Sequence, residues 1–350
     1  MLDRIGPMHH LPRADINEVL RRNSVDWSRL VDARMFITGG TGFFGRWLIA
    51  VLSAADAAFA LNLKITLLTR NVASAQRRIP GHEKVSWLEG DVRSFPLPPG
   101  QFDYLIHAAT DSSQAGQRDP DGLTAQVVNG TRRVIDFARQ AGVRRCLYVS
   151  SGAVYGRQPS QLEAMAETCP CRPSTGASAV YGQAKLAAED LMLAAGRHHD
   201  LNAVVARPFA CVGPGLPLDT HFAIGNFIRD ALRGGDVVVA SDGRPLRSYL
   251  YAADLADWLL TLLVRGDAGQ VYNVGSDRAI SIADLAGLVS SLVSPKGRIV
   301  IESPVVGGSS AHRYIPSIEK ARLGLGLDAW TSLESAICKT VDDARLRGAF

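Results

Sequence analysis

A glycine-rich turn near the start of the chain constrains its fold more than any other segment. Gly39, Gly42 and Gly45 follow a short apolar run at 34–38 and open an alanine-rich, helix-like run at 45–61. Glycines at such a turn let the chain reverse tightly, let the backbone approach a pyrophosphate and let the helix pack closely on the strand. The N–H groups at the start of the helix would attract the phosphates. The turn therefore predicts a dinucleotide-binding strand–turn–helix unit.

Apolar strands and amphipathic helices alternate along the rest of the chain. Strands are expected at 34–38, 64–69, 85–88, 104–108, 145–150, 203–207 and 271–274. Helices are expected at 45–61, 123–141, 180–195, 222–233, 252–264 and 281–292. Alternation at this spacing is typical of an α/β fold with a doubly wound parallel sheet, as in Rossmann domains.

A change of composition after Arg207 divides the chain. Prolines and glycines crowd the segment 208–217 and indicate a loop-rich crossing into a second lobe. We expect residues 1–33 to form an N-terminal extension and 34–207 to form the dinucleotide-binding domain, with a return strand near 250–278. Segments 208–249 and 279–350 are expected to form a smaller, discontinuous α/β substrate lobe.

The composition limits the partners and the location of the protein. The 350 residues carry a net charge of +4, and no run of Lys or Arg indicates a nucleic-acid surface. Five cysteines fit neither a disulfide framework nor a usual zinc spacing, which favours reduced thiols in the cytoplasm and no metal. No segment has the length and apolarity of a signal peptide or a membrane span.

Ser151, Tyr181 and Lys185 are the candidate catalytic residues. Tyr181 and Lys185 are four residues apart, which places them on one face of a helix. A phenol is a weak base at neutral pH, and a neighbouring ammonium is expected to lower its pKa. The pair could then move a proton to or from a sugar hydroxyl while a hydride moves, with Ser151 bonded to the same oxygen.

The end of the second strand is expected to choose the cofactor. An acidic residue there would bind a ribose hydroxyl, whereas an arginine would accommodate a 2′-phosphate. The chain has Thr69, Arg70 and Asn71 and no acid, so Arg70 mildly favours NADP over NAD. Asp91 could lie beside the adenine amino group, or it could cap its own loop.

These segments together resemble the extended branch of the short-chain dehydrogenase/reductase superfamily, the NAD(P)-dependent nucleotide-sugar epimerases and dehydratases. The resemblance covers about 34–325 and includes the glycine turn, the 106–110 and 129–131 segments, the 150–156 strand end, the 247–254 segment and the 272–275 strand. It implies that nine residues contact the cofactor in addition to Arg70: Gly39, Gly42, Phe43, Phe44, Gly45, Asp91, Ala108, Ala109 and Lys185. It also implies that Asn226, Arg247 and Arg313 contact a sugar nucleotide, because guanidinium groups suit a diphosphate.

Two positions beside Ser151 depart from the pattern of some relatives. The 4,6-dehydratases that the chain resembles carry Asp and Glu there, and the decarboxylases carry a glutamate at the second position. This chain has Gly152 and Ala153, which cannot exchange a proton. The family's asparagine is also replaced by Ala210, so one polar contact to the sugar could be missing.

We therefore expect an NAD(P)-dependent enzyme that acts at C4 of a nucleotide-diphosphate hexose, by 4-epimerisation or 4-keto reduction. A 4,6-dehydratase, a uronate decarboxylase, a reductase of ketones without a nucleotide and a non-catalytic cofactor sensor remain alternatives. His221 is either a sugar contact or a structural histidine. The resemblance also implies a homodimer.

Overall fold

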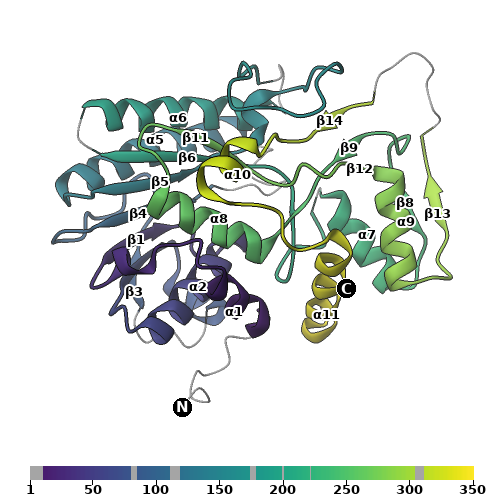
Figure 1. Ribbon diagram of the computed structural model, residues 1–350, viewed down its shortest axis with the longest axis horizontal. Coiled ribbons are helices and arrows are strands. Elements are labelled where there is room, and N and C mark those ends of the chain that lie inside the picture. The colour runs from purple at the N-terminus through teal and green to yellow at the C-terminus, as the bar shows by residue number, and fades with distance from the viewer. Residues whose placement is uncertain are drawn as a thin grey trace.

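The computed structural model describes residues 11–79, 85–110, 119–173, 179–198, 201–220, 222–303 and 311–350 (Figure 1). Its centre is a seven-stranded sheet in the order β11-β6-β5-β4-β1-β2-β3, in which every pair of neighbours is parallel. The strands are β1 (Arg34–Thr38), β2 (Lys64–Thr69), β3 (Val85–Glu89), β4 (Tyr104–His107), β5 (Arg145–Val149), β6 (Asn202–Pro208) and β11 (Val271–Val274). The doubly wound parallel sheet predicted from the sequence is confirmed.

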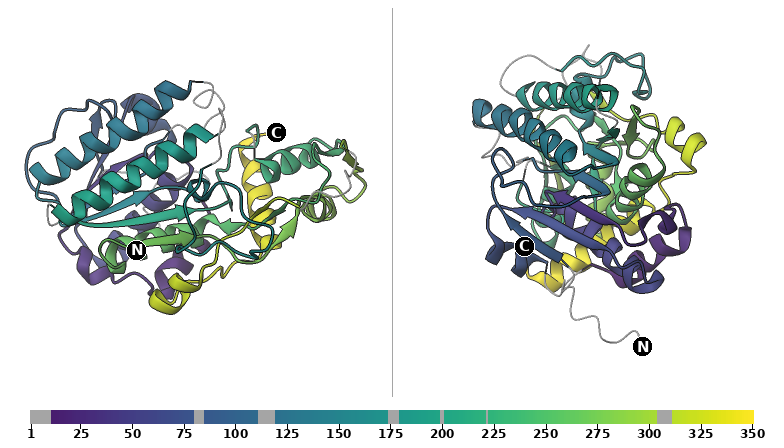
Figure 2. Two further views of the ribbon diagram at one scale, coloured as in Figure 1. Left: turned by 90° about the horizontal axis from the view of Figure 1, so that it is seen from above. Right: turned by 90° about the vertical axis from the view of Figure 1, so that its left-hand side faces the viewer.

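Helices cover both faces of this sheet. Helices α5 (Pro120–Gln140) and α6 (Val180–His198) lie side by side on one face (Figure 2). Helices α2 (Phe43–Phe59) and α8 (Ala252–Arg265) pack together on the other face. Because successive residues of a strand point to opposite faces, Phe36 of β1 packs with the α5–α6 core and its neighbours Met35 and Ile37 pack with the α2–α8 core.

The strand order reverses beside β1 and so locates a crevice. From β1 the chain builds outward to β2 and β3, and then builds β4, β5 and β6 on the other side. Thr38 and His107 are register partners at the carboxyl ends of β1 and β4. In open α/β sheets, ligands bind outside the carboxyl ends of the strands at such a reversal.

The chain leaves the main sheet after β6, returns for α8 and β11, and then leaves again. The second lobe holds three small sheets and lies to one side of the main sheet (Figure 2). Its strands are β7 (Cys211–Val212), β8 (Val237–Val239), β9 (Leu246–Arg247), β10 (Leu250–Tyr251), β12 (Ile280–Ser281), β13 (Ile299–Ile301) and β14 (Arg313–Tyr314). Its helices are α7 (Ala223–Leu232), α9 (Ile282–Val293) and α11 (Leu333–Arg347), whereas α10 (Glu319–Leu325) packs against β11 of the main sheet.

Several elements were not expected from the sequence. They include the short helices α3 (Val72–Arg78) and α10, the two-residue strands, and the longer helix α11. A strand of two residues is too short to show alternation of apolar and polar side chains, and tertiary contacts alone define it. The division of the chain into domains stays a prediction.

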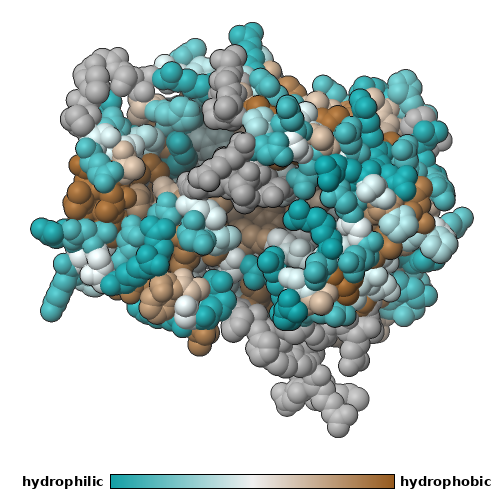
Figure 3. All heavy atoms as spheres, turned by 180° about the vertical axis from the view of Figure 1, so that it is seen from behind, coloured by the Kyte–Doolittle hydropathy of each residue, from teal (hydrophilic) through white to brown (hydrophobic). Residues whose placement is uncertain are grey.

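Two further observations concern the distribution of hydrophobic side chains on the surface and the ability of the helices to cross a membrane. On the face opposite to that of Figure 1, hydrophilic side chains are spread widely, hydrophobic ones lie between them, and the surface is hollowed near its centre (Figure 3). Within the described ranges, no helix combines the length and the apolar character needed to cross a bilayer.

The N-terminal segment is packed against the body of the molecule. Helix α1 (Arg13–Arg22) and the 3₁₀ helix η1 (Trp27–Leu30) bury Val19 and Leu30 completely in the core shared with α2 and α8. Residues 11–33 therefore form part of one face of the main core, although the sequence suggested an extension.

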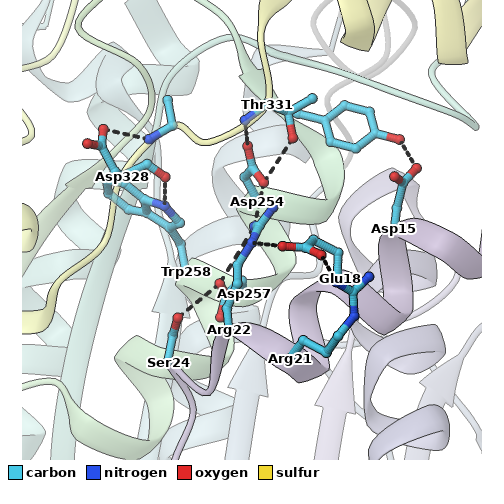
Figure 4. Close-up of polar contacts among 12 residues, drawn as sticks. Asp15, Glu18, Arg21, Arg22, Ser24, Asp254, Asp257, Trp258, Asp328 and Thr331 are labelled. Carbon is cyan, nitrogen blue, oxygen red and sulfur yellow. Dashed lines mark hydrogen bonds and ion pairs between the residues drawn. The ribbon is translucent and has the colours of Figure 1, made fainter.

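A buried ion cluster fastens this segment (Figure 4). Arg22 Nη1 lies 2.6 Å from Asp254 Oδ1 and 3.9 Å from Asp257 Oδ2, and both aspartates are fully buried on α8. The backbone N–H of Thr331 donates to Asp254 at 2.9 Å, and the Ser24 hydroxyl donates to Asp257 at 3.2 Å. One guanidinium group thus faces two carboxyl groups that have no access to water, and burial raises the pKa of Asp257 to about 7 despite it.

Candidate functional site

A cavity of about 610 Å³ opens at the carboxyl ends of β1, β2, β4 and β5, where the strand order reverses. All ten residues that the sequence predicts for the cofactor line it: Gly39, Gly42, Phe43, Phe44, Gly45, Arg70, Asp91, Ala108, Ala109 and Lys185. Its volume is in the range of cofactor pockets, which is about 300–1,000 Å³. The cavity thus has the place, the lining and the size that suit a dinucleotide.

Close backbone approaches explain the glycines of the turn. Gly39 has φ +76°, and a Cβ there would lie 2.5 Å from the carbonyl carbon of Ala108. A Cβ on Gly45 would lie 2.3 Å from the carbonyl oxygen of Gly39. At Gly42 the nearest atom is 3.4 Å away, which is ordinary contact. The turn is therefore held tightly between α2 and the end of β4.

Substitution of Gly39 should weaken cofactor binding. In Gly39→Ala, the new Cβ must displace Ala108, which lines the cavity, and the backbone has a left-handed φ that costs about 1–2 kcal/mol for an L-residue. We expect the Kd of NAD(P), measured by quenching of tryptophan fluorescence, to rise by at least about 10-fold, the equivalent of about 1.4 kcal/mol.

Gly142→Ala is the matched control for this prediction. Gly142 has a similar φ of +63°, but no atom lies within 4 Å of its Cβ position. The control should lose stability through the same backbone strain and keep the cofactor affinity of the wild type. Equal Kd values for the two variants would contradict the role assigned to Gly39.

Cationic and polar side chains surround the outer end of the cavity. Arg70, at the end of β2, and Arg78, at the end of α3, are both exposed and line the cavity. Asn71 caps α3, because its Oδ1 accepts from the N–H of Ser74 at 2.7 Å. Two guanidinium groups thus lie at the end where an adenosine ribose would bind.

Asp91 lines the same end of the cavity and also orders its own loop. Its carboxylate accepts from the backbone N–H of Arg93 at 2.9 Å and from the Arg93 guanidinium at 2.7 Å. The hydrogen bond from Arg93 holds the pKa of Asp91 below its usual value. The loop-capping alternative is therefore present in the structure, and the carboxylate still borders the cavity.

Tyr181 and Lys185 lie one turn apart on α6 and both line the cavity. Lys185 is 2% exposed, and its Nζ donates to Thr110 Oγ1 at 2.7 Å and to the carbonyl oxygen of Val149 at 2.8 Å. The Nζ lies 5.9 Å from the centroid of the Tyr181 ring. The helix spacing thus brings the two side chains together as expected.

We expected the ammonium of Lys185 to lower the pKa of Tyr181, and this expectation was wrong for this geometry. Burial raises the pKa of Tyr181, and only the hydrogen bond with Ser151 opposes that rise. Burial also lowers the pKa of Lys185 to about 7, against the opposing effect of Glu189. The ammonium is directed at Thr110 and Val149, so desolvation dominates at both groups.

Ser151 is the second residue after β5 and is the N-cap of the 3₁₀ helix η2 (Gly152–Tyr155). Its Oγ accepts from the backbone N–H of Ala153 at 3.1 Å. The same hydroxyl hydrogen-bonds with Tyr181, as noted above. The structure therefore brings Ser151 to Tyr181, and Tyr181 and Lys185 line the cavity.

A buried ion pair supports this wall from behind. Arg207 Nη2, on β6, lies 2.6 Å from Glu189 Oε2, on α6, and both side chains are almost fully buried. The Ser150 hydroxyl donates to Glu189, and Arg207 donates to Tyr155 Oη at 2.8 Å. The pair thus ties β5, β6, α6 and η2 together below the catalytic candidates.

The residues predicted for the sugar nucleotide lie in the second lobe, outside the lining of the cavity. Asn226, on α7, accepts from Arg229 at 3.0 Å. Arg247, on β9, donates to the carbonyl oxygen of Leu246 at 2.8 Å, and burial lowers its pKa. Arg313, on β14, is the register partner of Leu246, so the two arginines belong to adjacent strands. His221 lies outside the described residues.

Three residues at or near the site were not predicted. Glu189 could have been found, because it continues the four-residue spacing of Tyr181 and Lys185 on α6. Thr110 was named only as part of the 106–110 segment that resembles the family. Its contact with Lys185 depends on tertiary structure, so the sequence does not show it. Tyr314, on β14, approaches Ser151 from a distant part of the chain, and no local pattern marks it.

Comparisons with known proteins agree with this geometry. The family described as "NAD dependent epimerase/dehydratase family" matches residues 35–275. UDP-glucuronic acid decarboxylase 3 of Arabidopsis thaliana is 28% identical over 317 residues, which cover 90% of each chain. UDP-glucuronic acid decarboxylase 1 of Xenopus tropicalis is 28% identical and matches 88% of this chain and 71% of its own.

Solved structures show the same fold. UDP-glucose 4-epimerase of Thermotoga maritima, solved with UDP-glucose, matches with a TM-score of 0.76 and 22% identity over 90% of this chain and 99% of its own. MoeE5, solved with UDP-glucuronic acid and NAD, matches with a TM-score of 0.76 and 25% identity over the same shares of the two chains. The similarity extends over the second lobe as well as the main sheet.

Proposed function

Since this chain belongs to the NAD-dependent epimerase/dehydratase family, we propose that it uses NAD or NADP to act at C4 of a nucleoside-diphosphate hexose, as a 4-epimerase or a 4-keto reductase. The observation that carries the proposal is that Tyr181 and Lys185 line the dinucleotide-sized cavity and that Ser151 lies beside Tyr181. Bound NAD(P) would supply a hydride acceptor or donor there. The side chains have to manage the proton of the reacting hydroxyl.

Each of the three residues has a separate task in this proposal. Tyr181 exchanges the proton of the hydroxyl at C4, and its raised pKa keeps it a phenol that can protonate a forming alkoxide. Ser151 donates a hydrogen bond to the same oxygen. Lys185, at the junction of β5 and α6, orients the cofactor ribose and stabilises the phenolate that is left when Tyr181 gives up its proton in the reductive direction.

The residues that follow Ser151 favour hydride chemistry without elimination or loss of CO₂. Gly152 and Ala153 stand where resembling dehydratases and decarboxylases carry carboxylates. Among the described residues that line the cavity, Asp91 is the only acidic one, and it lies at the outer end beside Arg70. No described carboxylate therefore lines the wall beside Tyr181.

A sugar nucleotide is the proposed substrate, and the second lobe is its proposed binding site. Arg247 and Arg313 lie on paired strands and would bind the diphosphate, with Asn226 as a further polar contact. Relatives and a solved structure of 25% identity carry UDP-glucuronic acid in their names or complexes. A UDP-linked hexose or hexuronic acid is therefore the first substrate class to test.

Arg70 and Arg78 make NADP the mildly favoured cofactor. Two guanidinium groups and no carboxylate follow β2 at the ribose end, which suits a 2′-phosphate. A loosely held NADPH would fit a reductase, whereas a retained NAD would fit an epimerase. We further propose a cytoplasmic homodimer that binds neither nucleic acid nor membranes.

One experiment separates these possibilities. The purified protein is denatured and the released cofactor is identified by mass, and the protein is then incubated with UDP-glucose, UDP-galactose and UDP-glucuronic acid plus NAD. We expect retained NAD and a C4 epimer, seen by NMR, for an epimerase. A protein without retained cofactor should instead consume NADPH with a UDP-4-keto sugar.

Arg70→Ala should lower the preference for NADP over NAD by about 10-fold, because a charged hydrogen bond contributes about 1.5–3 kcal/mol.

Other products would overturn the proposal. Release of CO₂ from UDP-glucuronic acid would make the protein a decarboxylase despite Ala153, and a 4-keto-6-deoxy product would make it a dehydratase despite Gly152. Cofactor binding without turnover of any of these sugars would favour the sensor alternative.

A further inference from the structure

We propose that His107 is a positioning residue of the cofactor site, which holds a single neutral tautomer and, through the hydroxyl of Thr38, fixes the backbone of 108–110 at the wall of the cavity. The inference rests on the binding of NAD(P) in this cavity and is independent of the sugar that reacts. His107 ends β4, Thr38 ends β1, and the two are register partners where the strand order reverses.

Buried hydrogen bonds connect both nitrogens of the His107 ring. Thr38 Oγ1 lies 2.8 Å from His107 Nδ1, and Thr131 Oγ1, on α5, lies 3.1 Å from His107 Nε2. All three side chains are at most 1% exposed. Because buried polar groups need partners within the protein, each proton of this chain has to be placed between its own members.

The outer partners of the chain fix its direction. Thr131 donates its only side-chain proton to the carbonyl oxygen of Val127 at 2.7 Å, so its oxygen accepts from Nε2–H of His107. Burial, with a smaller effect of the Lys185 charge, lowers the pKa of His107 to about 3, so the ring is neutral and Nδ1 is an acceptor. The hydroxyl of Thr38 therefore donates to Nδ1, and its oxygen accepts from the N–H of Ala109 at 3.2 Å.

The segment that Thr38 holds forms part of the cofactor site. The N–H of Ala108 donates to the backbone carbonyl oxygen of Thr38 at 3.2 Å, so Thr38 accepts from two successive N–H groups. Ala108 and Ala109 line the cavity, and the carbonyl carbon of Ala108 lies only 2.5 Å from where a Cβ on Gly39 would be. A shift of this segment would therefore change the space between it and the glycine turn.

The same direction continues toward the catalytic lysine. Lys185 Nζ donates to Thr110 Oγ1 at 2.7 Å, and the Thr110 hydroxyl donates to the carbonyl oxygen of Ala109 at 2.7 Å. Among the described residues, Thr110 and Val149 thus accept two of the three ammonium protons, which leaves one for the cofactor ribose. His107 and Lys185 therefore hold the 108–110 segment from its two ends.

The first test is the Kd of NAD(P), measured by quenching of tryptophan fluorescence in the absence of any sugar. Thr38→Val keeps the shape of the side chain and removes the hydroxyl that joins His107 to Ala109. We expect the Kd to rise about 5–10-fold, the effect of about one lost hydrogen bond. Thr38→Ser restores the hydroxyl and should return the Kd to within about 2-fold of the wild type. An unchanged Kd in Thr38→Val, or no rescue in Thr38→Ser, would overturn the proposal.

Thr340→Val is the matched control. Thr340, on α11, is also fully buried, and its hydroxyl donates to the carbonyl oxygen of Ala336 at 2.6 Å. The control should lower the unfolding midpoint and leave the Kd within about 2-fold, because Thr340 is remote from the lining of the cavity. Equal rises in Kd for Thr38→Val and Thr340→Val would assign the effect to general destabilisation and contradict the role of His107.

The second test observes the tautomer directly, by long-range proton–nitrogen NMR of histidine-labelled protein. The signals of His107 are identified by their loss in His107→Gln. They should show a protonated Nε2 and an unprotonated Nδ1, unchanged from about pH 5 to about pH 8, because the pKa of about 3 lies below this range. A protonated Nδ1, or titration within this range, would overturn the proposal.

The NMR measurement also separates this inference from the proposed function, because it needs neither cofactor nor sugar. A protein that binds neither NAD nor NADP would contradict the proposed function and the role of His107 in the cofactor site together. A protein that binds NAD(P) and turns over no sugar of the panel would contradict the proposed function alone, and the Kd values would still decide the role of His107.

Discussion

Tyr181→Phe should lower kcat by about 10²–10⁴-fold, the usual contribution of a side chain that transfers a proton. The substitution removes the oxygen that hydrogen-bonds with Ser151 and keeps the ring that lines the cavity. The KM of the sugar nucleotide and the Kd of NAD(P) should change by less than about 3-fold, because the diphosphate and pyrophosphate contacts are elsewhere. Steady-state kinetics on the UDP-sugars named above measures both quantities.

The pH profile provides a second measurement for this residue pair. Burial lowers the pKa of Lys185 to about 7, so the ammonium is lost as the pH rises through this value. Turnover that needs the ammonium should therefore fall above about pH 7, and the fall should be absent in Lys185→Met. A Tyr181→Phe variant with the turnover of the wild type on every accepted sugar would show that another group moves the proton.

Arg22→Met should lower the free energy of unfolding by about 3–5 kcal/mol, as is usual when a buried pair loses one partner. The methionine keeps the contact with the Trp330 ring, over which the guanidinium carbon now lies at 4.4 Å. It leaves Asp254 and Asp257, both fully buried, without their cation. Urea unfolding followed by circular dichroism measures the loss.

Arg21→Met is the matched control. Arg21 is the neighbouring residue, is 69% exposed and, among the described residues, pairs only with Glu18 on the same helix, at 2.6 Å. Its loss should change stability by less than about 0.5 kcal/mol. Equal losses for the two variants would contradict the view that the ion cluster fastens the N-terminal segment.

The loss in Arg22→Met should grow with pH. Burial raises the pKa of Asp257 to about 7 although Arg22 opposes the rise, and Asp254 is raised in the same direction. A carboxyl whose pKa is raised on folding contributes stability at low pH and loses that contribution as the pH rises through its folded value. Removal of the cation raises both values further, so the difference between variant and wild type should be larger at about pH 8 than at about pH 5.5.

The sequence predicted the main sheet correctly because the relevant signals are local. Each of the seven strands is a run of apolar residues, and the glycine turn fixes which strand begins the nucleotide-binding unit. The small sheets of the second lobe could not be predicted, because strands such as 246–247 and 313–314 form only when distant segments meet. The packing of residues 11–33 was missed for the same reason, since polar partners such as Asp254 follow more than two hundred residues later.

The site likewise has some residues that local spacing predicts and others that only tertiary contacts reveal. Tyr181, Lys185 and the glycines are marked by spacing within one element, and the structure brings them to one cavity. The pKa of Tyr181 depends on burial, which spacing does not show, and there the expectation was wrong. Tyr314 is placed by a register between two strands, so only the folded chain reveals it.

The ion cluster of α1 also sets the order in which the chain can complete its fold during synthesis. Arg22 can pair with Asp254 only after 232 further residues have been synthesised, and Asp15 can pair with Lys339 only after 324 further residues. At about 5–20 residues per second, a ribosome needs roughly 10–60 s to supply these partners. During that time α1 can pack against α2, which follows it closely in the chain, while the surface that α8 covers in the folded protein stays open.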